Sequence, residues 1–316
     1  MTVPAIVDET AHAIVDACDA LAHGSLGGLP TETVYGLAAD ATNPQAVARV
    51  FAAKGRPAFN PLIAHVASTA MACREGVLDE RAQLLAETFW PGPLTLVVPV
   101  NAEGHVCELA RAGLQTIALR VPAHRVAQSL LGAYGKPLAA PSANPSGKLS
   151  PTSARDVAHA FGEEVAMVID GGSCEAGIES TIVGLLPSEP ARLLRPGIVS
   201  RNALLAYLPD LVGPTEGAIN APGQMSSHYA PGASVRLGAQ KLRDGEVMLG
   251  FGPDAPASSL NLSPSADLVE AAANLYRMLR ELDRQNPAAI AVMPVPEQGL
   301  GEAINDRLRR AAAPRN

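Results

Sequence analysis

The feature that most constrains the fold is an alternation of short apolar runs with amphipathic segments over the first two thirds of the chain. The apolar runs are rich in Val, Leu and Ile and cover 61–67, 94–100, 116–122, 137–143, 166–172 and 180–186. Segments with helical spacing lie between them, at 44–54, 80–89, 124–134 and 153–162. Short apolar runs indicate buried strands, and i, i+3, i+4 spacing indicates helices. The alternation therefore predicts an α/β fold around a substantial sheet.

Some connections between the predicted strands are too short to contain a helix. Residues 172–180 and 186–192 leave less than the roughly dozen residues that a parallel crossover requires. We therefore expect a mixed sheet rather than a purely parallel one.

The repeating pattern stops between about residues 208 and 232, where Pro, Gly and small polar residues show no periodicity. It resumes beyond this stretch, with a strongly helical segment at 266–285. We predict a large α/β domain over 1–207, a linker over 208–232 and a small α/β domain over 233–316. An aperiodic stretch of this length is more often functional than a plain connector.

Charge and cysteine content narrow the classes of protein. The net charge of −7 argues against a main task of gripping nucleic acid, because that task shows as a basic surface. The four cysteines are scattered without a CxxC pair, so we expect a reduced, cytoplasmic protein. The first 20 residues carry regularly spaced acids, which predicts an amphipathic helix rather than a signal peptide. No apolar run approaches the ~18 to 20 residues of a membrane span.

The usual nucleotide-binding signatures are absent, but polar residues gather in six clusters at strand ends or in the turns that follow them. Open α/β sheets form their sites in such places. The clusters lie at 30–36, 54–60, 116–122, 140–147 with 150–152, 170–172 with 179–182, and 194–197. If they converge, they form a cleft rich in cations and hydroxyls, suited to phosphates and a small zwitterion.

Each cluster also has a purely structural explanation. Thr31 or Thr33 would serve as a helix N-cap, and Lys54 and Arg56 would stabilise a helix C-terminus. A histidine such as His65 in an apolar strand is more often a satisfied core residue. An arginine in the apolar 116–122 run needs either an acidic side chain or an anionic ligand as its partner.

Taken together, the motifs resemble those of the YrdC-type threonylcarbamoyl-AMP synthases. Over about residues 10–200 they occur in the order PTETVYGL, KGRPAFNPL, WPGPLTLV, ALRVP, APSANPSG, SPT, DGG, ESTIV and LRPG. HYAP at 228–231, followed by a small α/β domain, is similar to the longer, two-domain branch. The resemblance implies a YrdC-like twisted mixed sheet with flanking helices, a smaller Rossmann-like C-terminal domain, and a linker that covers the active site.

The resemblance implies a nucleotidyltransferase that makes threonylcarbamoyl-AMP and pyrophosphate from L-threonine, bicarbonate or carbon dioxide, and ATP. Other proteins then transfer the threonylcarbamoyl group to an adenosine in certain tRNAs, so the enzyme itself need not contact tRNA. We expect Mg²⁺ to be carried on the phosphates, with no metal site in the protein. Two alternatives remain: an RNA-binding YrdC-like module, and a carbamoyl-transferring maturation factor, whose zinc-finger cysteines and acylphosphatase-like region this chain lacks.

By motif, the resemblance implies that L-threonine is bound by Thr33, His65, Arg120, Thr181, and Ser142 or its neighbour Ala140. It implies that ATP is bound by Lys54, Arg56, Asn60, Thr116, Ser142, Asn144, Ser150, Arg195 and Tyr229. Lys54 and Arg56 are the predicted catalytic residues, because with Arg195 they would offset triphosphate charge as the carbamate oxygen attacks the α-phosphorus. Arg120 would pair with the substrate carboxylate.

Two segments depart from the family pattern. The run GSLGGL at 24–29, just ahead of PTET, puts glycines where larger apolar residues are usual, so we predict a weak or bent strand there. The segment ahead of HYAP lacks basic residues, so it offers no cationic phosphate contact, although Tyr229 is kept.

Overall fold

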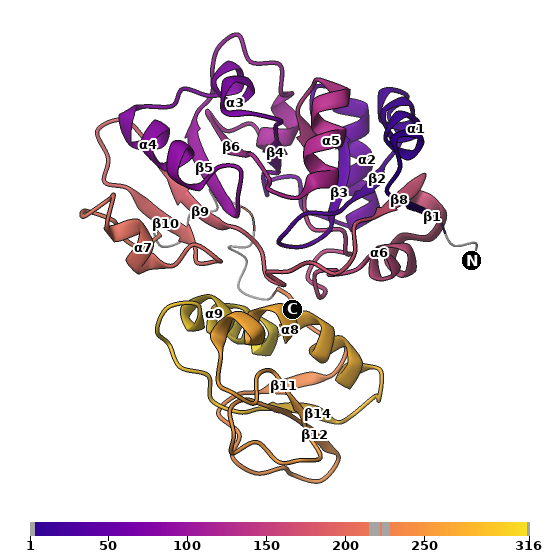
Figure 1. Ribbon diagram of the computed structural model, residues 1–316, viewed down its shortest axis with the longest axis vertical. Coiled ribbons are helices and arrows are strands. Elements are labelled where there is room, and N and C mark those ends of the chain that lie inside the picture. Colours follow the sequence, from indigo (N-terminus) through magenta and orange to yellow (C-terminus); the bar gives the residue numbers. More distant parts are fainter. Residues whose placement is uncertain (1–3, 215–221, 223–227, 315–316) are drawn as a thin grey trace.

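The computed structural model describes residues 4–214, 222 and 228–314. Two sheets organise the chain (Figure 1). The first has ten strands in the order β1-β8-β2-β3-β7-β4-β6-β5-β9-β10, and the second has four in the order β11-β14-β12-β13. Among the described residues, no helix is both long and apolar enough to cross a membrane.

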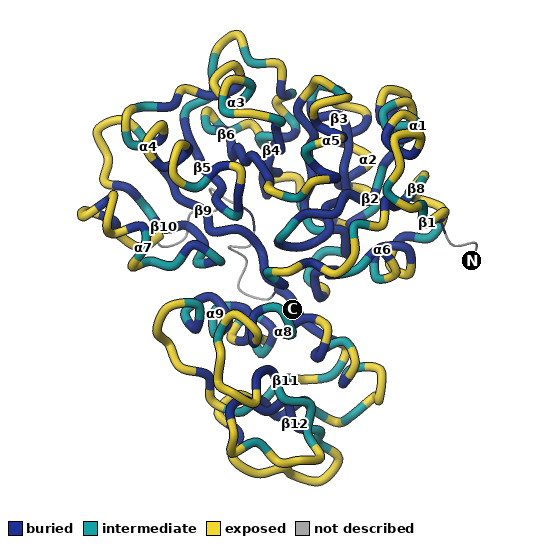
Figure 2. Tube along the Cα trace, viewed as in Figure 1, coloured by how far each residue is buried: buried dark blue, intermediate teal, exposed yellow. Residues whose placement is uncertain are grey.

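The first sheet is built from β1 (Ala5–Asp8), β2 (Gly27–Leu29), β3 (Gly36–Asp40), β4 (Ile63–His65), β5 (Leu94–Pro99), β6 (Thr116–Arg120), β7 (Leu138–Ala139), β8 (Met167–Asp170), β9 (Thr181–Gly184) and β10 (Arg192–Arg195). Its helices are α1 (Ala11–Ala22), α2 (Pro44–Lys54), α3 (Thr69–Glu75), α4 (Glu80–Phe89), α5 (Arg125–Tyr134), α6 (Ala154–Phe161) and α7 (Arg201–Leu205), with short 3₁₀ turns at Glu108–Arg111 and Gly162–Glu164. Figure 2 shows that the central strands of this sheet are buried, while the outer faces of its helices are exposed.

Capping residues explain why the predicted helices end where they do. The side chain of Asn43 accepts hydrogen bonds from the first turn of α2, proline occupies the start of that helix, and Gly55 ends it in the left-handed conformation with φ 58°. Asp79 caps α4 in the same way. Helices α2 and α4 therefore cover the ranges predicted from the sequence.

The N-terminal segment differs from the prediction of a single amphipathic helix. Ala5–Asp8 is a strand, β1, which pairs in parallel with β8. The helix begins only after Thr10, whose hydroxyl accepts a hydrogen bond from the Ala13 amide. The prediction was wrong for this strand because the pairing partner lies about 160 residues away in sequence, beyond the reach of local periodicity.

The expected mixed sheet is confirmed, with parallel pairs such as β4 with β6 and antiparallel pairs such as β5 with β6. The short 186–192 join forms part of the antiparallel β9–β10 pair. The 171–180 segment instead links β8 to β9, and β2, β3, β7, β4, β6 and β5 lie between these two strands in the sheet. This segment therefore runs from near one edge of the sheet to near the other, and Glu179 and Ser180 lie at its end, next to β9.

The glycine-rich strand β2 is short but remains within the sheet, paired with β3 on one side and β8 on the other. A Cβ atom at Gly28 would lie 2.7 Å from Cγ1 of Val168 in β8. Only glycine permits this close approach of the two strands. Of the glycines that depart from the family pattern, Gly28 is therefore matched to a bulky neighbour.

The second sheet is wholly parallel, which confirms a Rossmann-like C-terminal unit. It comprises β11 (Ser234–Arg236), β12 (Glu246–Gly250), β13 (Leu260–Asn261) and β14 (Ala289–Val292), with helices α8 (Leu268–Asp283) and α9 (Gly301–Ala312). Both helices lie between this sheet and the first unit (Figure 1). One buried apolar cluster joins Val34, Leu149 and Ile178 of the first unit to Leu275 and Ile304 of the second. The units are therefore packed together through a shared core.

Candidate active site

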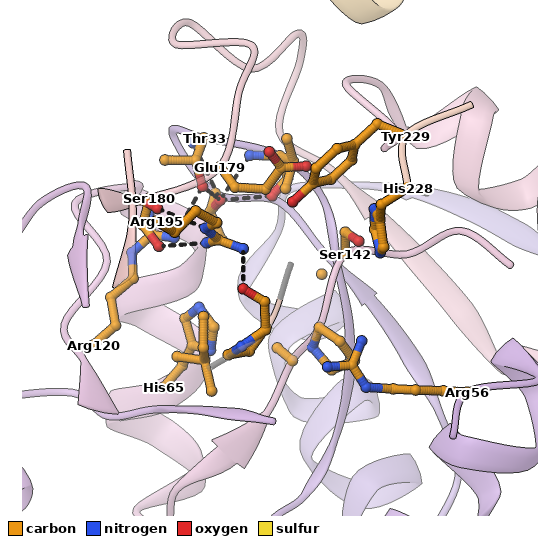
Figure 3. A pocket seen from close by; sticks show the side chains of 17 residues that line it. Thr33, Arg56, His65, Arg120, Ser142, Glu179, Ser180, Arg195, His228 and Tyr229 are labelled. Carbon is orange, nitrogen blue, oxygen red and sulfur yellow. Dashed lines mark hydrogen bonds between the residues drawn. The ribbon is translucent and has the colours of Figure 1, made fainter. Parts of the chain in front are cut away.

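A pocket lies where the predicted clusters meet, and most of the residues that line it are polar or charged (Figure 3). Its polar lining consists of Thr31, Thr33, Arg56, His65, Arg120, Ser142, Glu179, Ser180, Arg195, His228 and Tyr229. Eight predicted site residues reach this lining: Thr33, Arg56, His65, Arg120, Ala140, Ser142, Arg195 and Tyr229. The convergence inferred from the sequence is thus present in the structure.

Arg120 at the end of β6 is buried and ion-paired. Its Nη2 donates to Glu32 Oε1 at 2.6 Å, its Nη1 donates to Thr33 Oγ1 at 2.9 Å, and its Nε donates to the Gly92 carbonyl at 3.2 Å. Burial alone would raise the pKa of Glu32, but the charge and hydrogen bond of Arg120 lower it below its ordinary value. The acidic partner required of a buried arginine is therefore Glu32, and the hydrogen bonds to described residues use three of the five guanidinium N–H groups.

Lys54 stands behind the wall rather than in it. From the last turn of α2 its Nζ donates to the carbonyl oxygens of Ser142 and Asn144, at 2.6 and 2.5 Å. Burial, followed by the nearby charge of Arg56, lowers the pKa of Lys54 well below its ordinary value. In this arrangement Lys54 fixes the 142–144 turn that borders the pocket.

Arg56 lines the pocket and also holds its own loop. Its guanidinium donates to the Asn60 side chain at 2.7 Å and to the carbonyls of Asn60 and Pro61. Burial lowers the pKa of Arg56 to about 10, so it remains charged at neutral pH. The Asn60 side chain therefore holds Arg56 through its Oδ1, and its Nδ2 has no partner among the described residues.

Arg195 occupies the opposite wall, at the end of β10. Its Nε and Nη2 donate to the carbonyl and hydroxyl of Ser180, and its Nη1 donates to the carbonyl of Pro222 at 3.4 Å. Ser180 is fixed in turn by a 2.8 Å hydrogen bond between its hydroxyl and that of Thr95. A guanidinium held by neutral groups keeps its positive charge available to a ligand.

The two pocket histidines are neutral. Burial, together with the charge of Arg120, lowers the pKa of His65 to about 3. Burial also lowers the pKa of His228 to about 3. The Nδ1 atoms of both histidines, the hydroxyl of Tyr229 and Oδ1 of Asn144 are buried without a hydrogen-bond partner among the described residues. Buried polar atoms without a partner are rare in folded proteins, so each of these calls for an explanation.

The remaining predicted residues lie outside the pocket lining. The hydroxyl of Thr181 donates to the Val199 carbonyl, and that of Ser150 donates to Glu179. Thr116 lies at the other end of β6 from Arg120, in a separate hollow that also contains Val97 and Leu194. The residues that the motifs assigned to one site thus fall into three sets in the structure: those that line the pocket, those that hold the lining in place, and Thr116 in a separate hollow.

Sequence reasoning did not select Glu32, Glu179, Ser180 or His228 as site residues, although all except Glu32 line the pocket. Their motifs were recognised, but a motif does not tell which of its side chains face the cavity. Glu179 is also held by Arg307 of α9, 128 residues further along the chain. Nothing local in the sequence of an amphipathic helix indicates such a contact.

Comparison with known proteins identifies the family. A family model described as Telomere recombination matches residues 19–197, and one described as Threonylcarbamoyl-AMP synthase, C-terminal domain matches residues 199–313. The threonylcarbamoyl-AMP synthase of Pyrococcus abyssi is 40% identical over 312 residues, covering 92% of this chain and 91% of the relative. The chain belongs to the threonylcarbamoyl-AMP synthase family.

Other members of the threonylcarbamoyl-AMP synthase family also match nearly the whole chain. The Bacillus subtilis enzyme of that name is 36% identical over 326 residues, covering 96% of this chain and 93% of the relative. The crystal structure of P. abyssi Sua5 complexed with L-threonine matches with a TM-score of 0.89 and 37% identity, covering 98% of each chain. The two-domain resemblance and the nucleotidyltransferase class expected from the motifs are confirmed.

Proposed function

We propose that this pocket converts L-threonine, bicarbonate or carbon dioxide, and ATP into threonylcarbamoyl-AMP and pyrophosphate. The observation that carries the proposal is the lining itself, in which Arg56, Arg120 and Arg195 converge with unpaired buried polar atoms. The carboxylates in or beside the wall, Glu32 and Glu179, are each paired with an arginine. Such a site favours anionic ligands. Relatives that cover nearly the whole chain carry the name of this enzyme, which supports the same conclusion.

L-threonine is placed at the β6 end of the pocket. The two remaining N–H groups of Arg120 would bind its carboxylate, and the unpaired Nδ1 of a neutral His65 would accept a hydrogen bond from its amino or hydroxyl group. Thr33, held by Arg120, and the backbone near Ala140 and Ser142 would complete this part of the pocket. Thr181 would contribute through its place in the backbone beside Ser180, because its hydroxyl is already bonded to Val199.

ATP is placed between Arg56 and Arg195, with its triphosphate toward these charges. An apolar strip of Ile63, Ala118, Val97, Ile182 and Leu194 runs along the sheet between the pocket and the hollow of Thr116. The five residues of β6, which link the pocket to this hollow, span about 13 Å at ~3.3 Å per residue. The base would then lie toward Thr116, while Lys54, Asn60, Asn144 and Ser150 would act by fixing the surrounding turns.

The chemistry proceeds by positioning and charge stabilisation. The neutral amino group of threonine bonds through its nitrogen to the carbon of bicarbonate or carbon dioxide to give a carbamate. Water leaves when bicarbonate is used, and a proton passes to solvent when carbon dioxide is used. A carbamate oxygen then bonds to the α-phosphorus, and the bond from that phosphorus to the bridging oxygen of pyrophosphate breaks. Arg56 and Arg195 would stabilise the charge that develops on the departing pyrophosphate. A carboxylate nucleophile needs no general base at this second step.

We expect magnesium to enter this scheme bound to the phosphates of ATP. Among the described residues, no group of three or more His, Cys, Asp or Glu side chains could hold a metal ion. Mg²⁺ bound to ATP would neutralise part of the triphosphate charge. The protein's own cations, Arg56 and Arg195, would position those phosphates.

The 208–232 linker is proposed to cover the pocket. Pro222, His228 and Tyr229, which belong to it, line the cavity, and Pro222 accepts a hydrogen bond from Arg195. Residues 215–221 and 223–227 lie outside the described part of the chain. A cover has a chemical use, because the mixed carbamic–phosphoric anhydride hydrolyses readily and excluding water protects it.

The test is to incubate the purified protein with ATP, labelled bicarbonate and L-threonine, and to measure pyrophosphate together with the adenylate by mass. Both products should require all three substrates. Release of pyrophosphate at the same rate without threonine would contradict the synthase proposal. Affinity for tRNA that falls steeply with salt, in the absence of adenylate formation, would favour an RNA-binding module instead. Cytoplasmic location and transfer of the product to tRNA by other proteins belong to the same proposal.

A further inference from the structure

Glu179 is a buried carboxylate of the pocket wall that is held mainly by the C-terminal unit. Its Oε1 accepts a 2.5 Å hydrogen bond from the hydroxyl of Ser150. The hydroxyl of Tyr276 in α8 lies 3.0 Å from both carboxylate oxygens, and Nε of Arg307 in α9 donates to Oε2 at 2.8 Å. Two helices of the second unit thus reach a side chain that lines the pocket of the first.

Arg307 also contacts the linker residue that lines the pocket. Its guanidinium lies 5.1 Å from the ring centroid of Tyr229, within cation–π range. The Tyr276 ring lies 5.8 Å from the same tyrosine. Tyr229 is only 1% exposed, and its hydroxyl, directed toward the pocket in Figure 3, has no partner among the described residues. The pair Arg307 and Tyr276 therefore fixes both Glu179 and Tyr229.

The charge of Arg307 matters because Glu179 faces cations that the nucleotide needs. Burial opposes ionisation, but the charges of Arg307 and Arg195 lower the pKa of Glu179 to about 2, so it carries a full negative charge at neutral pH. Arg195 nevertheless directs its hydrogen bonds to Ser180 and Pro222. If Arg307 were absent, the buried carboxylate would be left to draw on Arg195 and to repel a triphosphate.

We propose that Arg307 and Tyr276 are positioning residues of the active site. They balance the negative charge of Glu179 and hold Tyr229 in place, so that Arg195 is available to the nucleotide. The C-terminal unit would then complete the ATP site. This inference rests on the proposed function. It assigns a role in nucleotide binding to two residues of the second unit that do not themselves line the pocket.

A second ion pair between the units provides a matched control. Arg201 of α7 donates to Glu302 of α9 at 2.6 Å, but neither residue lines the pocket. Arg201→Met removes an arginine–glutamate pair across the same interface without exposing a pocket carboxylate. Any general loosening of the two units should appear in this variant, although its pair is more exposed than that of Arg307.

The experiment measures KM for ATP, ATP affinity by calorimetry and the melting temperature for wild type, Arg307→Met, Arg201→Met and the double variant Arg307→Met/Glu179→Gln. Arg307→Met should raise both KM and Kd for ATP at least tenfold, with a smaller change in kcat. Arg201→Met should leave them within twofold of wild type. The double variant should bind ATP at least threefold more tightly than Arg307→Met does, because residue 179 no longer carries an unpaired negative charge.

Equal ATP constants in Arg307→Met and Arg201→Met, or a double variant no better than Arg307→Met, would overturn the inference. If Arg307→Met does not fold, Tyr276→Phe decides, since it removes one hydrogen-bond donor to Glu179 and keeps the ring. Its KM for ATP should rise threefold or more, and an unchanged value would overturn the inference. Failure of the proposed function is distinguishable, because wild type itself would then form no adenylate.

Discussion

Replacing Arg120 with methionine separates a structural role from a substrate-binding role at the same residue. The variant keeps much of the side-chain volume but removes the ion pair to Glu32 and the hydrogen bonds to Thr33 and Gly92. Removing one partner of a buried pair costs about 3 to 5 kcal/mol. Because the Glu32 side chain is 14% exposed, we expect the lower end, about 3 kcal/mol, or roughly 6 to 12 °C in melting temperature.

Loss of the substrate carboxylate contact adds a separate effect on binding. Hydrogen bonds to charged groups are worth about 1.5 to 3 kcal/mol, so L-threonine should bind roughly 10- to 150-fold more weakly to Arg120→Met. Calorimetry with L-threonine and with ATP measures this effect, and ATP affinity should change much less. Melting temperatures measured on the same samples report the structural effect.

Two further variants distinguish the roles. Arg120→Met/Glu32→Gln no longer buries an unpaired carboxylate and should regain at least half of the lost melting temperature, yet remain defective for L-threonine. Glu32→Gln alone frees the guanidinium and should bind L-threonine at least as tightly as wild type. If the double variant binds L-threonine like the wild type, Arg120 serves only to hold Glu32 and the substrate assignment is refuted.

Lys54→Met should lower adenylate formation at least tenfold, because the carbonyls of the 142–144 turn lose their donor, and initial rates of pyrophosphate release measure this. Wild-type rates in this variant would show that the turn holds its position unaided. Gly28→Ala should lower the free energy of unfolding by about 1 to 3 kcal/mol, because the added methyl group overlaps a valine of β8. Gly27→Ala, whose added methyl group would meet no atom closer than 4.0 Å, should lower it less. Chemical denaturation measures both values, and equal losses of unfolding free energy would contradict the close-packing argument. The pKa of Glu179 is lowered to about 2 from an unfolded value of about 4.3, so its contribution to stability is present above pH 4.3 and is lost as the pH falls toward 2. The drop in melting temperature from pH 5 to pH 3 should therefore be larger in wild type than in Arg307→Met. An equal or larger drop in the variant would contradict the pairing of Glu179 with Arg307.

Local patterns predicted the parts of the fold that local forces determine. The α2 and α4 helices have side-chain caps at their first turns, so their ends are encoded within a few residues. Strand β1 was missed because its stability comes from pairing with β8 far along the chain. The strand order places β8 and β9 near opposite edges of the sheet. This placement likewise depends on the path of residues 171–180, whose sequence shows no periodicity.

The same distinction applies to the site. Motifs identified most of the turns that border the pocket, but they did not separate residues that face it, such as Arg56, from those that support it, such as Lys54. That separation depends on backbone direction and on which partner each side chain finds. Arg307 could not be found this way, since its significance arises only from the packing of α9 against the first unit.

The neutral histidines have a consequence for how the rate should vary with pH. His65 and His228 would gain a proton only near pH 3, Glu179 keeps its charge down to about pH 2, and Arg56 keeps its charge up to about pH 10. Lys54, whose pKa is also lowered, faces two backbone carbonyls behind the wall. His65, His228, Glu179 and Arg56 therefore keep the same charge across the ordinary working range. Acid–base behaviour of the reaction there would be set by the reactants, above all by the amino group of L-threonine, which has to shed its proton before it can bond to carbon.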